Sequence, residues 1–181
     1  MVGLVNRNGV DVTAAYGITQ QLWTYVQMPA MAIGAAVSAM AAQNIGARRW
    51  DRVSAITRSG ILFNVVITGT VIAAALIFDR PLLMLFVPEG SAVLGIAQHI
   101  NVIATWGFVL FGATMVLFGV VRANGAVWGP LAILFLSMFP VRLGIAVLLR
   151  PLLGADALWW SFPAGSATTV TLAALYYAHG G

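Results

Sequence analysis

Residues 14–43, AAYGITQQLWTYVQMPAMAIGAAVSAMAAQ, form an uncharged run that decides the fold class. An α-helix rises 1.5 Å per residue, so about 20 consecutive apolar residues cross a hydrocarbon layer of roughly 30 Å. This run is longer than that, and it lacks the charged face that a surface helix of a soluble domain presents to water. It therefore predicts a membrane-spanning helix.

The rest of the chain has the same character. Of its 181 residues, 61% are hydrophobic and 8% are charged, whereas about a quarter of the residues in a soluble domain are charged. We predict an all-α integral membrane protein that forms one membrane domain over residues 1–181, with five full spans plus the end of a sixth helix. The predicted spans cover residues 14–43, 59–78, 92–121, 127–149 and 157–177.

The connector at residues 44–58 gives the strongest signal for orientation, because it holds four arginines and one acid. The positive-inside rule places it in the cytoplasm, and alternation of the spans then predicts a cytoplasmic C-terminus. The chain has nine arginines and no lysine, mostly at the ends of apolar runs, where they meet lipid head groups. Membrane lipid is thus an expected partner and nucleic acid is not.

An odd number of spans places the two termini on opposite faces. The apolar segment at residues 2–5 predicts the tail of a preceding helix, and with it a missing N-terminal part. The same alternation places three acids in external connectors, namely Asp79, Glu89 and Asp156, and no predicted span contains an acid.

Small residues recur at every fourth position of the first span, at Ala30, Gly34, Ser38 and Ala42. This spacing predicts one helix face that lets a neighbouring backbone approach closely. Pro29 lies in the same span and lacks the N–H that would bond to the carbonyl of residue 25, so we expect a kink there.

Polar side chains form faces on several spans, and unsatisfied amides are costly in hydrocarbon. These faces predict either hydrogen bonds between helices or the wall of a wet cavity, and the sequence leaves both open. The candidate cavity residues are Gln20, Thr24, Gln27, Asn64, Asn101 and Thr105. The tryptophans at 23, 106, 159 and 160 are interpreted as packing and interface anchors.

Arg142 is the one charge well inside a predicted span. It either extends outward to the interface or faces a cavity, where it could pair with an acid or a substrate anion. Pro140, two residues earlier, predicts a bend in this span. His99 is the candidate for proton handling, because its side chain titrates near neutral pH.

The sequence predicts neither an enzyme nor a metal site. Catalysis inside a bilayer generally needs paired acids, a metal cluster or an activated nucleophile, and none is assembled here. The chain has no cysteine, and its two histidines lie far apart in the sequence.

Two motifs resemble those of the multidrug and toxic compound extrusion (MATE) family. The first is QMPAMAIGAAVSAMAAQNIGARRWDR at residues 27–52, which is similar to a helix with a proline and a glycine followed by Gln-Asn-x-Gly-Ala and a basic loop. Its matching residues are Pro29, Gly34, Gln43, Asn44 and Gly46. The second is VRANGAVWGP at residues 121–130, which is similar to the Arg-x-x-Gly turn of the family, with Arg122 and Gly125.

The resemblance implies one lobe of a twelve-helix transporter in a bacterial inner membrane. Such a protein exports cationic or amphipathic drugs in exchange for protons or sodium ions by rocking of two lobes, and it needs no cofactor besides the ion gradient. The implied partners are small-molecule drugs and a missing N-terminal lobe. Some family members carry a cation-binding acid in the tenth helix, whereas the corresponding span here, residues 92–121, has none.

Two alternatives are a flippase for lipid-linked precursors, from the same superfamily, and a non-transporting membrane subunit. A flippase would be expected to have a strongly basic cavity, and Arg142 is the one arginine deep in a predicted span.

Overall fold

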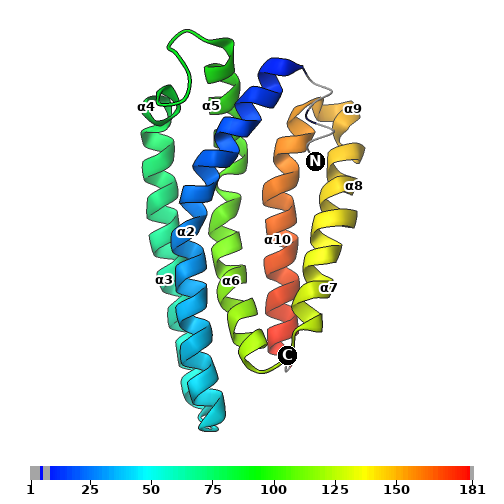
Figure 1. Cartoon of the computed structure of the whole chain (residues 1–181). Coiled ribbons are helices and arrows are strands. Elements are labelled where there is room, and N and C mark those ends of the chain that lie inside the picture. The colour runs from blue at the N-terminus through cyan, green and yellow to red at the C-terminus, as the bar shows by residue number, and fades with distance from the viewer. Residues whose placement is uncertain (1–4, 6–8, 180–181) are drawn as a thin grey trace.

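The computed structural model describes residue 5 and residues 9–179, and the elements among them are helices. A π-helical turn at Ser137–Val141 joins two of these helices. The helices are α2 (Val10–Gly46), α3 (Trp50–Ile77), α4 (Asp79–Met84), α5 (Ala92–Ala104), α6 (Gly107–Ala123), α7 (Trp128–Leu136), α8 (Arg142–Leu148), α9 (Arg150–Leu153) and α10 (Asp156–Ala178). Figure 1 shows the long helices side by side, with α2 packed on α3 and α6, and α10 packed on α6 and α8.

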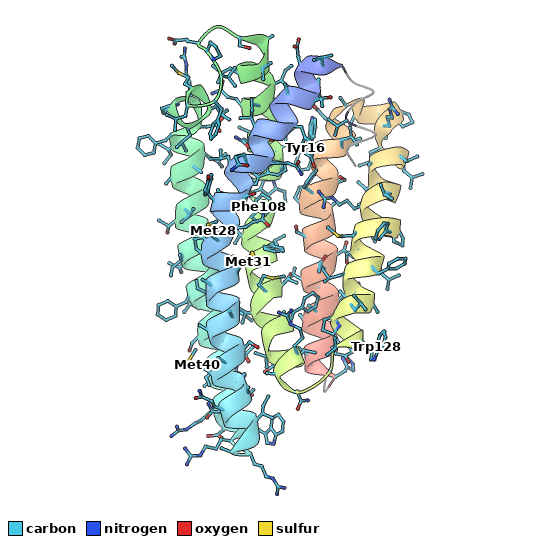
Figure 2. All side chains as sticks on the ribbon, in the orientation of Figure 1. Tyr16, Met28, Met31, Met40, Phe108 and Trp128 are labelled. Carbon is cyan, nitrogen blue, oxygen red and sulfur yellow. The ribbon has the colours of Figure 1, made fainter. Side chains whose placement is uncertain are left out.

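Several of the described helices have the length and composition of membrane spans. Three continuous stretches qualify, namely Val10–Gly46, Trp50–Ile77 and Trp128–Leu148, and the bent pair α5–α6 makes a fourth. Large apolar side chains cover the exterior, such as Phe63, which is 63% exposed, and Trp128, which projects away from the bundle in Figure 2. This confirms the prediction of an all-α integral membrane protein.

The predicted fifth span is α10, which extends one residue beyond the predicted range at each end. It is long enough to cross a membrane, but its serines and threonines make it less apolar than the spans that qualify. Apart from Val5, which is buried, the predicted tail of a sixth helix lies outside the described residues.

The connections alternate between the two ends of the bundle. Figure 1 shows the α2–α3 and α6–α7 turns at the end where α10 finishes, whereas α4 and α9 lie at the other end. This arrangement agrees with the predicted alternation of connectors. The cytoplasmic location of residues 44–58 and of the C-terminus stays a prediction.

The third predicted span, residues 92–121, is not one continuous helix. It is broken into α5 and α6, which meet at an angle of 48°. At the break, Phe108 N–H bonds to the carbonyl of Thr105, and Val109 N–H bonds to that of Trp106, so the pattern tightens to three-residue bonds. A side chain on Gly107 would meet the backbone of Pro163 in α10 at 2.9 Å. The broken span therefore packs tightly against α10 at this point.

Both prolines expected to disturb helices coincide with irregularities. Pro140 lies in the π-helical turn between α7 and α8, where the regular four-residue bonding is interrupted as predicted. Pro29 lies inside α2, and that helix changes direction close to Met28 and Met31 (Figures 1 and 2).

The predicted small-residue face packs α2 against α6. A Cβ on Gly34 would lie 3.0 Å from Met115 Cβ, and Ser38 Oγ donates a 2.9 Å hydrogen bond to the carbonyl of Gly119. Ala42 is wrong as a member of this face, because it is exposed while Ala41 is buried. A spacing of four advances about 40° beyond a full turn at each step, so three steps rotate Ala42 off the contact.

In the α2–α3 turn, the Gln-Asn-x-Gly-Ala motif acts through its backbone carbonyls and not through a left-handed glycine. The carbonyl of Gln43 accepts from Ala47 N–H, and that of Asn44 accepts from Arg49 N–H. Gly46 remains helical, and the left-handed residue of the turn is Arg48, with φ 56°. The motif thus ends the helix through its backbone carbonyls.

The Arg-x-x-Gly turn after α6 is a Schellman motif. Gly125 has φ +85°, its N–H bonds to the carbonyl of Arg122, and Ala126 N–H bonds to that of Val121. The side chain of Arg122 returns to the carbonyl of Phe118 at 3.1 Å. The glycine is required here because a Cβ is unfavourable in this conformation.

We expect Gly125→Ala to destabilise the protein by about 1 kcal/mol, because alanine resists the left-handed conformation. Gly46→Ala is the matched control, since Gly46 is helical and an added Cβ would meet no atom within 4 Å. Thermal unfolding in detergent measures both variants. Equal melting temperatures for the two would contradict this account of the turn.

Candidate functional site: a cavity between α2, α6, α8 and α10

A cavity of about 710 Å³ opens between the first half of α2 and the helices α6, α8 and α10. Figure 2 shows Tyr16 and Phe108 in the space between α2 and α10. Its wall is formed by Tyr16, Gly17, Gln20, Gln21, Trp23, Thr24, Gln27, Ala104, Gly107, Phe108, Phe111, Met138, Arg142, Phe162 and Ser166. The volume is within the range of about 300–1,000 Å³ that is typical of small-molecule sites.

Aromatic rings from three helices form one side of this cavity. Trp23 of α2 lies edge-on to Phe108 of α6 and Phe162 of α10, with ring centroids 5.4 and 5.0 Å apart. Tyr16 stands edge-on to the same indole at 6.1 Å. The interpretation of Trp23 as a packing residue holds, since it is 3% exposed. Its place on the cavity wall was not predicted, because the partner rings lie far away in the sequence.

The amide stripe of α2 also lines the cavity. Gln20, Thr24 and Gln27 all line the cavity, and each bonds within its own helix. Gln20 Nε2 donates to Tyr16 Oη at 3.0 Å, and Gln27 Nε2 donates to the carbonyl of Trp23 at 3.2 Å. Gln20 and Thr24 are exposed. Their remaining hydrogen-bonding capacity is therefore available to a ligand, to water or to another protein surface.

Arg142 is the one charged residue among the described residues that line the cavity. Its guanidinium carbon lies 3.5 Å from the centroid of the Phe162 ring, a cation–π contact. The Arg142 stem passes Gly165, where a Cβ would lie 3.6 Å from Arg142 Cδ. Arg142 thus lines the cavity instead of extending outward to the interface, and both placements were open from the sequence.

A smaller pocket of about 90 Å³ adjoins Arg142. Arg142 Nε and Ser137 Oγ both border it, and both are buried without a hydrogen-bond partner among the described residues. Ser137 belongs to the π-helical turn, and its hydroxyl lies on the wall of the same small pocket as Arg142. Together they offer donors to a polar group entering from the main cavity.

The other three cavity candidates lie behind the wall instead of on it. Asn64 is fully buried, and its Nδ2 donates to the Ala30 carbonyl at 3.0 Å, tying α3 to α2. Asn101 Oδ1 and Thr105 Oγ1 both accept from Trp23 Nε1, at 2.9 and 3.2 Å. All three residues thus take part in hydrogen bonds between helices, which is the other role that the sequence left open.

His99 lies outside the cavity wall. Its Nε2 is 2.9 Å from Asp156 Oδ1, in an exposed pair that connects α5 with the start of α10. The residues that the structure describes contain no group of three side chains able to hold a metal ion. A role for His99 in proton handling stays a prediction.

Asp79 differs most from the sequence-based expectation. It follows α3 directly in a predicted external connector, yet it is 6% exposed. Asn101 Nδ2 donates to Asp79 Oδ1 at 2.7 Å, and Gln98 donates a second hydrogen bond. Burial raises the pKa of Asp79 more than these donors lower it. Sequence reasoning missed it because Asp79 lies in a short connector that also holds the charged residues Arg80 and Glu89, and such a connector predicts solvent exposure.

The raised pKa of Asp79 predicts a stability that falls with rising pH. Between the pKa of the unfolded chain, about 3.9, and the higher pKa of the folded one, the folded state retains a proton that the unfolded state has lost. Stability therefore decreases as the pH rises through this window and remains lower at neutral pH. An amide does not ionise, so Asp79→Asn is expected to raise the melting temperature at neutral pH, and this gain disappears as the pH falls toward about 4.

Thermal unfolding in detergent at a series of pH values tests this expectation. Asp156→Asn is the control, because that carboxyl lies in the exposed pair with His99. A lower melting temperature for Asp79→Asn than for the unchanged protein at neutral pH would refute the expectation.

The helices and their apolar exterior define a multi-pass α-helical membrane protein. The cavity between its helices has the size of a small-molecule site. The MatE family model matches residues 1–148, and the chain belongs to this family, the MATE family of transporters. It is 36% identical to the probable multidrug resistance protein YoeA and 32% identical to the probable multidrug resistance protein YpnP, both of Bacillus subtilis strain 168. These matches cover 98% and 99% of this chain.

A solved structure shows the same fold. The crystal structure of the Vibrio cholerae MATE transporter VcmN in the bent form superposes on 98% of this chain with a TM-score of 0.89 and 20% sequence identity. The chain spans 38% and 40% of the lengths of YoeA and YpnP, and 40% of VcmN.

Proposed function

We propose that this chain forms one lobe of a secondary active multidrug exporter, which extrudes amphipathic or cationic compounds in exchange for protons or sodium ions. The observation that carries the proposal is the cavity of about 710 Å³ whose wall combines aromatic rings with amides. Aromatic faces accept flat apolar compounds of many shapes, while a few amides orient them. Such a wall suits a carrier that accepts many different molecules.

The exposed polar stripe of α2 supports a second lobe as partner. Gln20, Gln21 and Thr24 are exposed within a span whose surroundings are otherwise apolar. Amides facing hydrocarbon are costly, so a second protein surface or a water-filled cleft should cover them. We infer that the cavity faces an N-terminal lobe, and that rocking of the two lobes alternates access to it. The ion gradient drives the cycle, and no cofactor is required.

The cavity does not favour the flippase alternative. Arg142 is the one cation among the described wall residues, and its guanidinium already lies on the ring of Phe162. A site for a pyrophosphate-linked lipid would need several cations to neutralise the ligand.

Export of ethidium tests the proposal. Inverted membrane vesicles are prepared with this chain alone and with this chain joined to an N-terminal lobe from a MATE relative. We expect ethidium transport that depends on an ion gradient only when both lobes are present. Absence of transport in the two-lobe protein, with both lobes folded, would refute the proposed function, and transport by this chain alone would refute the need for a second lobe.

The proposed site of action is the bacterial inner membrane, with residues 44–58 and the C-terminus in the cytoplasm. The chain has no cysteine, so single cysteines report orientation directly. In intact cells, an impermeant maleimide is expected to label Leu152→Cys, which lies in α9 at the opposite end, and to leave Ser54→Cys unlabelled until the cells are permeabilised. Labelling of Ser54→Cys in intact cells would reverse the proposed orientation.

A further inference from the structure

The buried carboxylate of Asp79 has amide donors, and among the described residues no cation is paired with it. Asn101 and Gln98 donate to it, and the ion pairs found among the described residues involve other groups. An asparagine at this position could accept the same hydrogen bonds without the cost of burying a charge. A structural role alone therefore does not account for an acid here.

Asp79 is connected to the cavity wall by two consecutive hydrogen bonds. Asn101 Nδ2 donates to Asp79 Oδ1 at 2.7 Å, and Asn101 Oδ1 accepts from Trp23 Nε1 at 2.9 Å. Trp23 lines the cavity and touches the rings of Phe108 and Phe162. All three linked residues, Asp79, Asn101 and Trp23, are buried, so water does not compete strongly for these bonds.

We propose that Asp79 is a proton-binding site whose protonation state is transmitted to the drug cavity through Asn101 and Trp23. The proposal rests on the proposed function as far as transport is concerned, whereas proton binding itself does not depend on it. The proton comes from water at the α4 end of the bundle and returns to water, so the carboxylate gains and loses one proton with no other chemical change.

The donor and acceptor roles along these hydrogen bonds explain how protonation of Asp79 affects Trp23. A carboxylate only accepts, so the Asn101 amide must turn its NH₂ toward Asp79 and its oxygen toward the indole. A protonated carboxyl can donate, and the amide then turns its oxygen toward Asp79 and its NH₂ toward the indole, which is also a donor. Trp23 Nε1 consequently loses this acceptor and retains Thr105 Oγ1, which already lies at 3.2 Å. The indole shifts, and the aromatic wall shifts with it.

Among the residues that the structure describes, the charged groups near Asp79 are paired with one another and not with Asp79. Arg80, the residue after Asp79, pairs with Glu89 at 2.7 Å, and both side chains are more than 60% exposed. His99, from α5, pairs with Asp156. The charges of α3, the other helix packed against α4, lie in its first turns, at least 19 residues or about 28 Å of helix before its end. These are Asp51, Arg52 and Arg58.

Infrared and fluorescence titrations of the purified chain in detergent test the site without transport. We expect a carboxylic acid band that disappears as the pH rises, and a change in tryptophan fluorescence with the same midpoint. Asp79→Asn should remove both signals, Trp23→Phe should remove the fluorescence change alone, and Asp156→Asn should retain both. Persistence of both signals in Asp79→Asn would overturn the proposal.

Two further variants separate transmission from structural support. Asn101→Leu removes a donor to the charged carboxylate, so the infrared midpoint should move to higher pH and the fluorescence change should be lost. Thr105→Val removes the second acceptor of the indole, on which the protonated state depends. The proton affinity of Asp79 should therefore fall about tenfold, and the infrared midpoint should move about one pH unit lower. Infrared midpoints that move in the same direction in both variants would overturn the proposed transmission from Asp79 to Trp23. An unchanged fluorescence response in Asn101→Leu would overturn it as well.

The two-lobe protein distinguishes this inference from the proposed function. If it transports ethidium, Asp79→Asn should remove the dependence of transport on pH. Transport by Asp79→Asn with an unchanged pH profile would overturn the coupling through Asp79 while leaving the function intact. Absence of transport by the unchanged two-lobe protein, with the two titrations present, would refute the function and leave the proton site intact.

Discussion

Gly34→Leu is expected to abolish the folded state, whereas Ala35→Leu on the same helix should be tolerated. A Cβ on Gly34 would lie 3.0 Å from Met115 Cβ, 3.1 Å from the Met115 carbonyl oxygen and 3.2 Å from its carbon. Most of these atoms are backbone, so they cannot move aside as the end of a side chain can. Overpacking usually costs about 1–3 kcal/mol, and a full isobutyl group against the α6 backbone should exceed that range.

Ala35 is the matched control because it is exposed and its neighbour in sequence is the glycine itself. Both variants introduce the same side chain into the same helix, and helix propensity favours replacing glycine over replacing alanine, so it acts against the expected difference. Size-exclusion chromatography and thermal unfolding in detergent measure the difference. Similar monodisperse yields and melting temperatures for the two variants would contradict the close contact of α2 with α6.

Ser166→Trp is expected to weaken ethidium binding at least about tenfold, equivalent to about 1.4 kcal/mol. Ser166 lines both the main cavity and the smaller pocket beside Arg142. An indole at this position would occupy the space next to Phe162 and exclude a flat ligand from the aromatic wall. Fluorescence titration of ethidium measures the effect in the two-lobe protein, and efflux should fall with binding.

Thr171→Trp serves as the control for this substitution. Thr171 lies on α10 as Ser166 does, but it is exposed and lies outside the cavity wall. We expect its ethidium affinity to match that of the unchanged protein. An unchanged affinity in folded Ser166→Trp would show that drugs bind elsewhere.

The spans were predictable because hydrophobicity over about 20 residues follows directly from the thickness of a bilayer. The bend at Thr105–Gly107 was not, because no proline marks it, and the contact of Gly107 with Pro163 joins positions far apart in the sequence. Ala42 was misplaced for a geometric reason, since a spacing of four does not match 3.6 residues per turn.

The candidate site was predictable only in part. The stripe of Gln20, Thr24 and Gln27 follows from helical spacing within one span, and it does lie on the cavity. Asn101 and Asp79 required tertiary information, because their partners come from different helices. The family resemblance predicted helix order and turns, and it gave no indication that a connector acid is buried.

The break between α5 and α6 gives this span a mechanical property that an unbroken helix lacks. Bending a continuous helix strains many hydrogen bonds at once, whereas tilting α5 against α6 needs rotation at only a few dihedral angles near Thr105. α6 is fixed to α2 by the contact at Gly34 and the Ser38 bond to Gly119. A tilt of α5 about this bend would therefore move Asn101, Gln98 and the end of the cavity wall at Ala104, while α6 stays packed on α2.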